Sequence, residues 1–300
     1  MDSWSTRYMT TVSLVCATRG RTVEVERLFN SLVAQQCSSM EVIVVDQNED
    51  GRLDPILDHF RQLLQITHIR MGAQGVSAAR NAGFKAARGK IVSFPDDDCW
   101  YPPTLVKDVE AWFAEHSDYA VLAVACLDES GIKSGNRWFQ DDCDLKVSNA
   151  LRTTMMPTVF LACTPAMREV FFDEELSYGE DTDFVLRQLK SGVKGRLDSK
   201  LNIFHPCRDM LSGNVTPERA VKYGSGMGFL VRRHATLVMW VALLTYDLFR
   251  AALVACRGRL HDSSIVFAHA RGLSRGYMKA ALRGDFRGLD KHRILLDSED

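Results

Sequence analysis

Three consecutive carboxylates, Asp96-Asp97-Asp98, are the residues of this chain whose types and spacing point most directly to chemistry. They follow the apolar run 91–94, whose β-branched and aromatic residues favour a buried strand, and Pro95 should end that strand because proline has no amide hydrogen to donate. Ligands of open α/β sheets bind at the carboxyl ends of strands. Adjacent carboxylates repel one another unless a cation holds them, and Mg²⁺ and Mn²⁺ prefer oxygen ligands and substrate phosphates. The run therefore indicates a divalent-metal site, with a solvated acidic turn or a helix N-cap as the alternatives.

Polar residues follow other expected strands in the same way. Thr18 and Arg19 come after the first strand, and Asp46 comes directly after the second. Arg80 lies near the start of an Ala-rich helix, where its guanidinium could bind a phosphate in bidentate fashion. A carboxylate for a base or ribose, a guanidinium for phosphates and carboxylates for a metal together make a nucleoside-diphosphate site.

Alternating strands and helices must position these loops. The apolar periodicity predicts strands over 11–16, 41–45, 66–69, 91–94 and 120–125, with helices over 22–37, 55–64, 77–87 and 104–115 between them. Strands that alternate with helices form a parallel sheet with both faces covered. The first 125 residues are therefore expected to be doubly wound α/β.

The remaining chain divides into a continuation of this domain and a different C-terminal region. A strand is expected over 158–163, an acidic loop over 172–183 leading into a helix over 184–190, and a short strand over 202–205, whereas 127–151 is polar and has no clear pattern. After Asn214 the sequence becomes basic and helical. We expect a catalytic domain over 10–210 and a basic, partly apolar helical region over 211–300.

Charge is distributed unevenly along the chain. The net charge of the 300 residues is −1, which gives no sign of nucleic-acid binding. From Lys222 to Arg293, however, there are 13 Lys and Arg against 4 Asp, a net charge of +9. This asymmetry indicates that the C-terminal region faces an anionic surface.

The segment 235–246 has no charge but is only 12 residues long, and a membrane span needs about 20. Extending it brings in Asp247 and Arg250, which are costly in lipid and are spaced so that they could pair. The pattern favours an amphipathic helix at a membrane surface or facing a partner over a span. A core helix of a helical subdomain is the alternative.

The cysteines and the N-terminus indicate a reducing cytoplasm. The eight cysteines form no C-x-x-C pair, and several lie in apolar runs, where a free thiol behaves as a small apolar side chain. Residues 1–11 are polar and do not resemble a signal peptide. We therefore expect neither disulfides nor a zinc site.

The order of these motifs resembles the family 2 glycosyltransferases, inverting enzymes of the GT-A fold, here of the bacterial polysaccharide type. The resemblance covers about residues 10 to 207 and rests on the segments 11–18, 41–46, 75–83, 89–103 and 179–187. It implies a Rossmann-like, mostly parallel central sheet flanked by helices. Each segment alone is a weak signal, and their combination in this order is specific.

The resemblance also assigns roles on the donor side. Asp46 matches the acidic residue that reads the nucleotide base, and Thr18 and Arg19 match the loop that lines the nucleotide. Arg80 matches an arginine near the donor. Asp97 belongs to the acidic motif that binds the nucleotide sugar.

The remaining assignments concern the metal and the catalytic base. Asp98 matches the direct ligand of Mn²⁺ or Mg²⁺, and Asp96 lies near the ribose or the metal. His205 matches a late histidine that is found near the metal or the diphosphate in some members. Glu180 and Asp181 match the acidic pair that supplies the catalytic base, with Asp181 as our choice.

These features predict an inverting, metal-dependent glycosyltransferase. Its donor would be a UDP-sugar, or a GDP- or dTDP-sugar, and its acceptor a glycan or a lipid-linked molecule at the cytoplasmic face of a membrane. Two alternatives remain open. A non-catalytic sugar-nucleotide or glycan-binding protein on the same fold would have no use for the pair Glu180 and Asp181. A nucleotidyltransferase would need a Gly-rich phosphate loop after the first strand, and residues 18–21 resemble such a loop only weakly.

Overall fold

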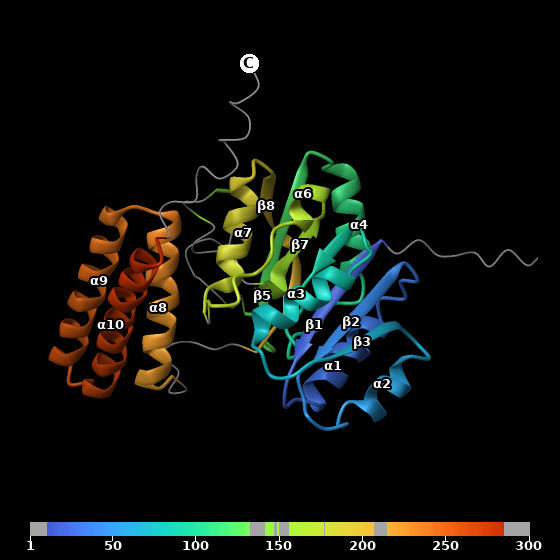
Figure 1. The fold of residues 1–300 in the computed structure, drawn as a ribbon, viewed down its shortest axis with the longest axis horizontal. Coiled ribbons are helices and arrows are strands. Elements are labelled where there is room, and N and C mark those ends of the chain that lie inside the picture. The colour runs from blue at the N-terminus through green and yellow to red at the C-terminus, as the bar shows by residue number, and fades with distance from the viewer. Residues whose placement is uncertain are drawn as a thin grey trace, which may run out of the picture. The chain divides into compact units, whose positions relative to one another are not determined.

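Strands and helices alternate through the first half of the chain as the apolar periodicity predicts (Figure 1). The computed structural model describes residues 11–132, 142–146, 149, 156–176, 178–206 and 215–284. The first nine elements are β1 (Val12–Thr18), α1 (Val23–Val33), β2 (Met40–Asp46), α2 (Asp54–Phe60), β3 (Gln65–Arg70), α3 (Val76–Ala86), β4 (Ile91–Ser93), α4 (Leu105–Glu115) and β5 (Tyr119–Leu127).

The second half begins with shorter elements. These are β6 (Cys143–Leu145), the 3-10 turn η1 (Met156–Thr158), β7 (Val159–Ala162), α6 (Pro165–Arg168), α7 (Glu180–Lys190) and β8 (Lys194–Phe204), followed by the helices α8 (Pro217–His234), α9 (Leu237–Cys256) and α10 (Leu260–Leu282). The chain forms two compact units. One spans Met1–Glu174 and Arg187–Cys207, and the other spans Glu175–Leu186 and Arg208–Asp300.

An eight-stranded sheet in the order β3-β2-β1-β4-β7-β5-β8-β6 forms the centre of the first unit. The neighbours β3, β2, β1 and β4 are parallel, as are β5 and β8, whereas β7 and β6 run antiparallel to the strands beside them. This confirms an α/β fold with a mostly parallel central sheet and a helical C-terminal region. Because β1, β2, β4, β5 and β8 point the same way, their carboxyl ends share one edge.

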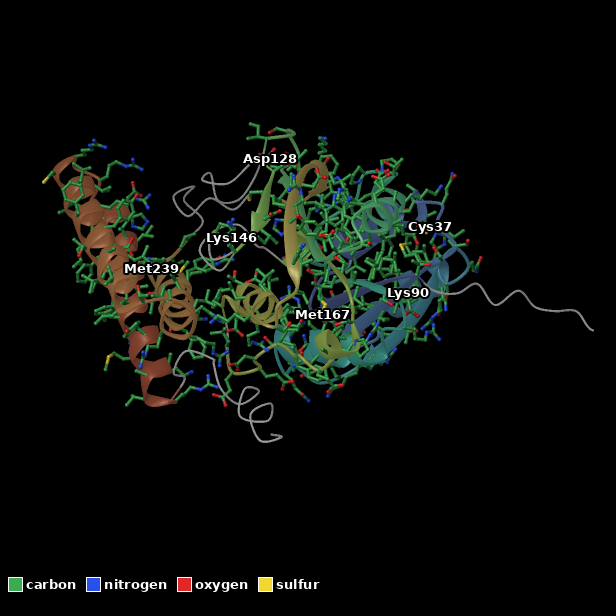
Figure 2. The ribbon with its side chains drawn as sticks, turned by 90° about the horizontal axis from the view of Figure 1, so that it is seen from above. Cys37, Lys90, Asp128, Lys146, Met167 and Met239 are labelled. Atoms are coloured by element: carbon green, nitrogen blue, oxygen red, sulfur yellow. The ribbon has the colours of Figure 1, made fainter. Side chains whose placement is uncertain are left out.

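Both faces of the sheet are buried. One face packs against α1, α2 and α4 through a continuous apolar cluster that includes Phe29 and Phe60, whose rings meet edge to face with centroids 5.3 Å apart. On the other face α3 approaches so closely that a Cβ on Gly83 would overlap Val15 and lie 3.0 Å from Val45 Cγ2. Met167, labelled in Figure 2, is fully buried. The near-continuous apolar character of β1 and β2 follows from this double coverage.

Three expected elements differ from the structure. The short strand expected over 202–205 is the end of the 11-residue β8, whose earlier part alternates polar and apolar residues. The helix expected from 184 begins at Glu180, so the end of the acidic loop is the first turn of α7. Residues 237–246 of the charge-free segment belong to the 20-residue α9, which is long and apolar enough to cross a membrane by length and composition.

The second unit is built on close helix packing. Gly224 and Gly228 of α8 face Gly272 and Gly276 of α10, and an added Cβ at any of them would overlap the backbone of the other helix. Small residues at a spacing of four allow helix backbones to approach in this way. The backbones of α8 and α10 are therefore in close contact along this face.

Candidate active site

The carboxyl edge of the sheet collects the residues that the sequence singled out. Thr18 and Asp46 stand opposite each other at the ends of β1 and β2, and Asp96 forms an isolated parallel bridge with Ala17. The amide of Gln47 donates to the carbonyl of Thr18 at 3.0 Å. The loops after β1, β2 and β4 are thus held together by backbone contacts.

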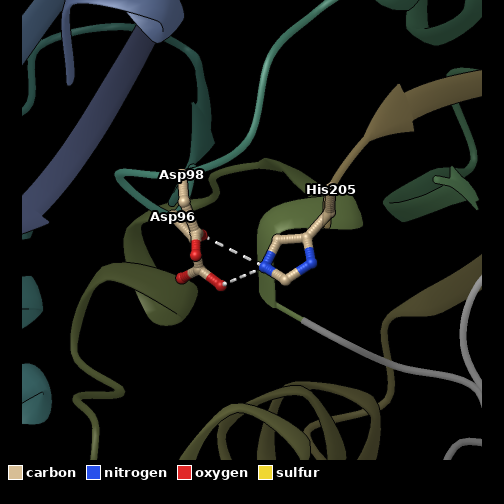
Figure 3. Close-up of side chains that lie close together, drawn as sticks. All are labelled: Asp96, Asp98 and His205. Carbon is tan, nitrogen blue, oxygen red and sulfur yellow. Dashed lines mark ion pairs between the residues drawn. The ribbon is translucent and has the colours of Figure 1, made fainter. Parts of the chain in front are cut away.

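Asp96, Asp98 and His205 form a candidate metal site at this edge (Figure 3). One ligand atom from each lies within 4.8 Å of the others, and His205 Nε2 is 3.2 Å from Asp98 Oδ1 and 3.6 Å from Asp96 Oδ2. Two carboxylates and an imidazole are a donor set that suits Mn²⁺ or Mg²⁺. The residues present therefore fit the metal that the sequence predicts.

Two backbone contacts hold His205 in place. Its amide donates to the carbonyl of Leu127 at 2.8 Å, and the preceding residue, Phe204, pairs in antiparallel fashion with Trp100. Trp100 follows the three carboxylates almost directly in sequence. The end of β8 is thereby attached to the carboxylate loop, which brings His205 to Asp96 and Asp98.

The ring of His205 is oriented for ligation. Nδ1 lies 2.9 Å from the carbonyl oxygen of Pro206, which can only accept, so Nδ1 carries the hydrogen and Nε2 faces the carboxylates. Burial disfavours the imidazolium, but hydrogen bonds to Asp96 and Asp98 outweigh it and raise the pKa of His205 to about 9. A proton on Nε2 thus occupies the position that a metal ion would take.

Asp97 points away from this group toward the loop after β1. Its Oδ2 accepts a 2.7 Å hydrogen bond from Thr18 Oγ1, and its Oδ1 is paired with the guanidinium of Arg21. Arg21 Nη1 also lies 2.9 Å from Asp98 Oδ2. Burial raises the pKa of Asp97, and Thr18 and Arg21 counteract this only in part.

Arg80 pairs with Asp96. Its Nη2 lies 2.8 Å from Asp96 Oδ1, the residue is 5% exposed, and its guanidinium carbon is 5.5 Å from the centre of the Phe172 ring. Burial opposes ionisation of Asp96, yet His205 and Arg80 together lower its pKa. Arg80 therefore fixes one metal-facing carboxylate.

Asp46 is buried and both of its oxygens have partners. Oδ1 accepts from the amide and the side chain of Asn48 at 2.8 Å and 2.7 Å, and Oδ2 lies 3.1 Å from His68 Nε2. The Asn48 side chain in turn accepts a 2.7 Å hydrogen bond from the amide of Gly20. Asp46 thus organises the loops that follow β1 and β2 together with a histidine of β3.

Arg19 is exposed and, among the described residues, has no hydrogen-bond or ion-pair partner. Gly20, at φ +77°, turns the chain so that Arg21 rather than Arg19 reaches the carboxylates. Arg21 and His68 are the residues of this site that the sequence patterns missed. Arg21 could have been found only from its proximity to Thr18 in sequence. His68 could have been found only from its position on the strand beside Asp46.

Glu180 and Asp181 lie in the second unit, at the N-terminal turn of α7. Both are partly exposed, and Asp181 Oδ1 accepts a 2.7 Å hydrogen bond from the amide of Thr182. Carboxylates at this end of a helix are stabilised by the helix dipole. The next acidic residue, Asp183, is fully buried.

A family model described as Glycosyl transferase family 2 matches residues 13–175 of the chain. The chain belongs to this family. The matched residues include Thr18, Asp46, Arg80 and the three carboxylates 96–98, whereas Asp181 and His205 lie beyond them. Family 2 membership favours a glycosyltransferase over the nucleotidyltransferase alternative.

Two curated relatives are described as glycosyltransferases. The uncharacterized glycosyltransferase alr2836 of Nostoc sp. is 32% identical over 159 residues, which are 50% of this chain and 47% of that protein. The uncharacterized glycosyltransferase EpsJ of Bacillus subtilis is 36% identical over 75 residues, which are 25% of this chain and 22% of that protein. The chain thus spans less than half the length of either relative.

Solved structures share the fold. The S. aureus protein TarS, residues 1–349 in complex with UDP-GlcNAc, superposes with a TM-score of 0.59 at 20% identity, over 93% of each chain. The mannosyltransferase PcManGT from Pyrobaculum calidifontis, in complex with GDP-Man and Mn²⁺, gives a TM-score of 0.57 at 13% identity, over 97% of this chain and 79% of that one. At these identities the likeness concerns the fold, which is GT-A.

Proposed function

We propose that this family 2 chain is an inverting, metal-dependent glycosyltransferase that moves a sugar from a nucleoside diphosphate sugar to an acceptor hydroxyl. The observation that carries the proposal is the group Asp96, Asp98 and His205 at the carboxyl edge of the sheet, with Arg80 paired to Asp96. A binding protein would need carboxylates and cations to recognise its ligand. It would not need the acidic pair at the start of α7.

Asp96, Asp98 and His205 would hold Mn²⁺ or Mg²⁺, which would supply positive charge for the departing diphosphate. Arg80 orients Asp96 and adds a fixed cation beside it. The exposed guanidinium of Arg19 is available for the diphosphate oxygens without first giving up a partner among the described residues.

The nucleoside is assigned to the loops after β1 and β2. Asp46 holds the side chains of Asn48 and His68 in fixed orientations, and this arrangement reads the base. Thr18, tied to Asp97, lines the same edge. A UDP-sugar is the favoured donor. UDP-GlcNAc and GDP-mannose, which TarS and PcManGT bind in their solved complexes, are the first two to test.

Asp181 is proposed as the catalytic base, with Glu180 beside it. An inverting transfer needs one carboxylate to take the proton of the acceptor hydroxyl while the sugar leaves from the opposite face. No second carboxylate is required as an acid, because the diphosphate leaves as an anion whose charge is neutralised by cations. The acceptor is a glycan or lipid-linked molecule at the cytoplasmic face of a membrane, in polysaccharide or glycolipid biosynthesis.

Thermal unfolding with UDP, GDP and dTDP, each with and without Mn²⁺, tests the donor site. A ligand of the folded state at 100 times its dissociation constant adds about 2.7 kcal/mol of stability. We expect one nucleotide to raise the melting temperature in a Mn²⁺-dependent way, and Asp98→Asn to remove the Mn²⁺ dependence. Asp58→Asn, which changes an exposed carboxylate on α2, is the matched control and should retain it. If no nucleotide stabilises the protein under any condition, the proposal is wrong.

A further inference from the structure

The outward half of α9 carries no charge along its entire length. The charged residues of α9 are Asp247, which is buried, and Arg250, which is partly buried. The exposed positions include six large apolar side chains, which we call the α9 apolar face: Leu237, Val238, Val241, Leu248, Phe249 and Leu253. A helix on the surface of a soluble protein normally turns its polar side outward. An apolar patch of this length marks a docking surface.

The opposite side of α9 is fixed on α10 by polar and aromatic contacts. Asp247 Oδ2 lies 2.7 Å from His269 Nδ1, and the Trp240 and Tyr277 rings lie 4.8 Å apart. Asp247 thus contacts His269 and not Arg250, the partner that the spacing suggested. Because α10 lies along α9 and carries exposed charges such as Arg271, α9 cannot be surrounded by lipid as a spanning helix would be.

The positive charge of the C-terminal helices indicates what the α9 apolar face binds. Residues 215–284 contain 11 Lys and Arg against 3 Asp and Glu. Two copies meeting through this unit would bring two strongly cationic bodies together, whereas an anionic surface would attract it. Exposed Arg257 and Arg259 lie at the end of α9, where they can reach headgroups while the helix lies in the interface. We propose that the α9 apolar face docks the protein, in the plane of the interface, on an anionic lipid bilayer.

Vesicle flotation with the full chain tests this. Wild type should float with vesicles of phosphatidylcholine and phosphatidylglycerol, more weakly with phosphatidylcholine alone, and less in high salt. Phe249→Glu should lower the vesicle-bound fraction at least about tenfold, because a charge replaces an exposed aromatic ring that would enter the lipid interface. The matched control is Val23→Glu, which places the same charge at an apolar site on α1 that is at least as exposed. It should leave flotation unchanged.

Two results would overturn the docking proposal. Wild type that floats with neither kind of vesicle has no lipid affinity. A dimer in sedimentation velocity that Phe249→Glu dissociates would assign the α9 apolar face to a second copy instead. Nucleotide-dependent thermal stabilisation should be the same in wild type and Phe249→Glu, so failure of lipid docking can be told apart from failure of the donor site.

A second, independent observation concerns the turn that carries the acidic pair. Asp183 is fully buried, and its Oδ1 accepts hydrogen bonds from Arg233 Nη1 at 2.9 Å and His234 Nε2 at 2.8 Å. Both donors are the last residues of α8. A buried carboxylate bound by two donors fixes the helix turn to which it belongs.

The segment before α7 also lies on α8. A Cβ on Gly226 would overlap the carbonyl of Tyr178, and one on Gly179 would lie 2.9 Å from Leu230 Cδ1. The rings of Tyr178 and Tyr223 meet edge to face at 5.0 Å. The α8 positions 223, 226, 230, 233 and 234 share one helix face. One side of α8 thus supports residues 178–183 along their length.

We infer that Arg233 and His234 are positioning residues that hold Glu180 and Asp181 in their working orientation. This inference rests on the proposed function, because it assumes that Asp181 is the base. Neither Arg233 nor His234 is expected to touch the substrate. Their effect should therefore appear in the chemical step and not in donor binding.

Steady-state kinetics separates the two effects. Arg233→Ala should lower kcat about 10- to 100-fold, because a small displacement of the base is costly, and should leave KM for the donor within about twofold. Arg233→Lys should recover much of the rate. Arg232→Ala, which removes the neighbouring guanidinium over the Tyr277 ring, is the control and should leave kcat unchanged.

The outcomes distinguish this inference from the proposed function. Unchanged kcat in Arg233→Ala, with transfer abolished in Asp181→Asn, would refute positioning and leave the base assignment intact. Full transfer in Asp181→Asn would refute the base assignment itself. Parallel losses of kcat and donor affinity in Arg233→Ala, without rescue by Arg233→Lys, would indicate general destabilisation and contradict the inference.

Discussion

Trp100 and Phe204 exchange two backbone hydrogen bonds, at 3.0 Å and 2.9 Å, and stack their rings with centroids 5.4 Å apart. The guanidinium of Arg27 lies 4.1 Å from the centre of the Trp100 ring and donates through Nη2 to the carbonyl of Asp98 at 2.8 Å. This single cross-link joins the carboxylate loop to the end of β8. We expect it to help set the distance between Asp98 and His205.

Phe204→Ala should weaken Mn²⁺ binding without removing a ligand. Loss of a stacked aromatic pair costs about 1 kcal/mol beyond the lost area, which corresponds to roughly a fivefold weaker affinity if the ligands are displaced accordingly. Isothermal titration with Mn²⁺ and the stabilising nucleotide measures this. His116→Ala, which removes the ring stacked on Trp112 elsewhere in the first unit, should leave Mn²⁺ affinity unchanged. Equal affinities in wild type and Phe204→Ala would show that the cross-link does not set the site.

Asp181→Asn should abolish transfer while preserving the fold. The amide keeps the size of the side chain but cannot take a proton from the acceptor, so we expect a loss of kcat of about 100-fold or more. Donor binding, measured by thermal shift, should be retained because the donor residues lie in the first unit. Glu175→Gln, at an exposed position before the same helix, serves as the control. A variant that keeps full activity would mean that another group is the base.

Glu41→Gln should destabilise the first unit and change its response to acid. The Glu41 carboxylate is 1% exposed and accepts from Ser13 Oγ at 2.6 Å and from Arg88 Nη2 at 2.6 Å. Burial opposes its ionisation, but these hydrogen bonds prevail and lower its pKa below the ordinary 4.5. Because the folded-state pKa is the lower one, this stabilisation is complete above about pH 4.5 and is lost as the pH falls through the folded-state value.

The expected loss for Glu41→Gln at pH 7 is about 1–3 kcal/mol, since an amide would turn a donor toward Arg88. Denaturant unfolding at pH 7 and at pH 3 measures it, and the difference between wild type and variant should shrink at the lower pH. Glu115→Gln, at the exposed end of α4, should have little effect at either pH. A difference that grows on acidification would contradict the assignment.

Gly83→Ala should destabilise the protein although alanine favours helices. An added methyl group would overlap Val15 and press on Val45, both fully buried in the sheet. Overpacking of this kind costs about 1–3 kcal/mol. Gly72→Ala, at an exposed position with open space around it, should be close to neutral. Equal thermal stability of the two variants would show that α3 can move away from the sheet at little cost.

Much of this arrangement was determined by the sequence alone. Apolar periodicity located the strands and helices from β1 to β5, but not β6, and the carboxyl ends of parallel strands placed Thr18, Asp46 and residues 96–98 at one edge. These inferences succeeded because periodicity and strand termination depend on neighbouring residues. The acidic pair at 180–181 was recognisable by its motif, and its catalytic role is still a prediction.

The tertiary structure decided which side chains meet. Gly20 turned Arg21 toward the carboxylates and left Arg19 exposed, and the bridge between Trp100 and Phe204 attached the end of β8, with His205, to the carboxylate loop. Asp247, in the middle of α9, meets His269 of α10. Contacts between residues about 20 to 110 positions apart depend on strand order and packing. Local sequence patterns reveal neither the strand order nor the packing.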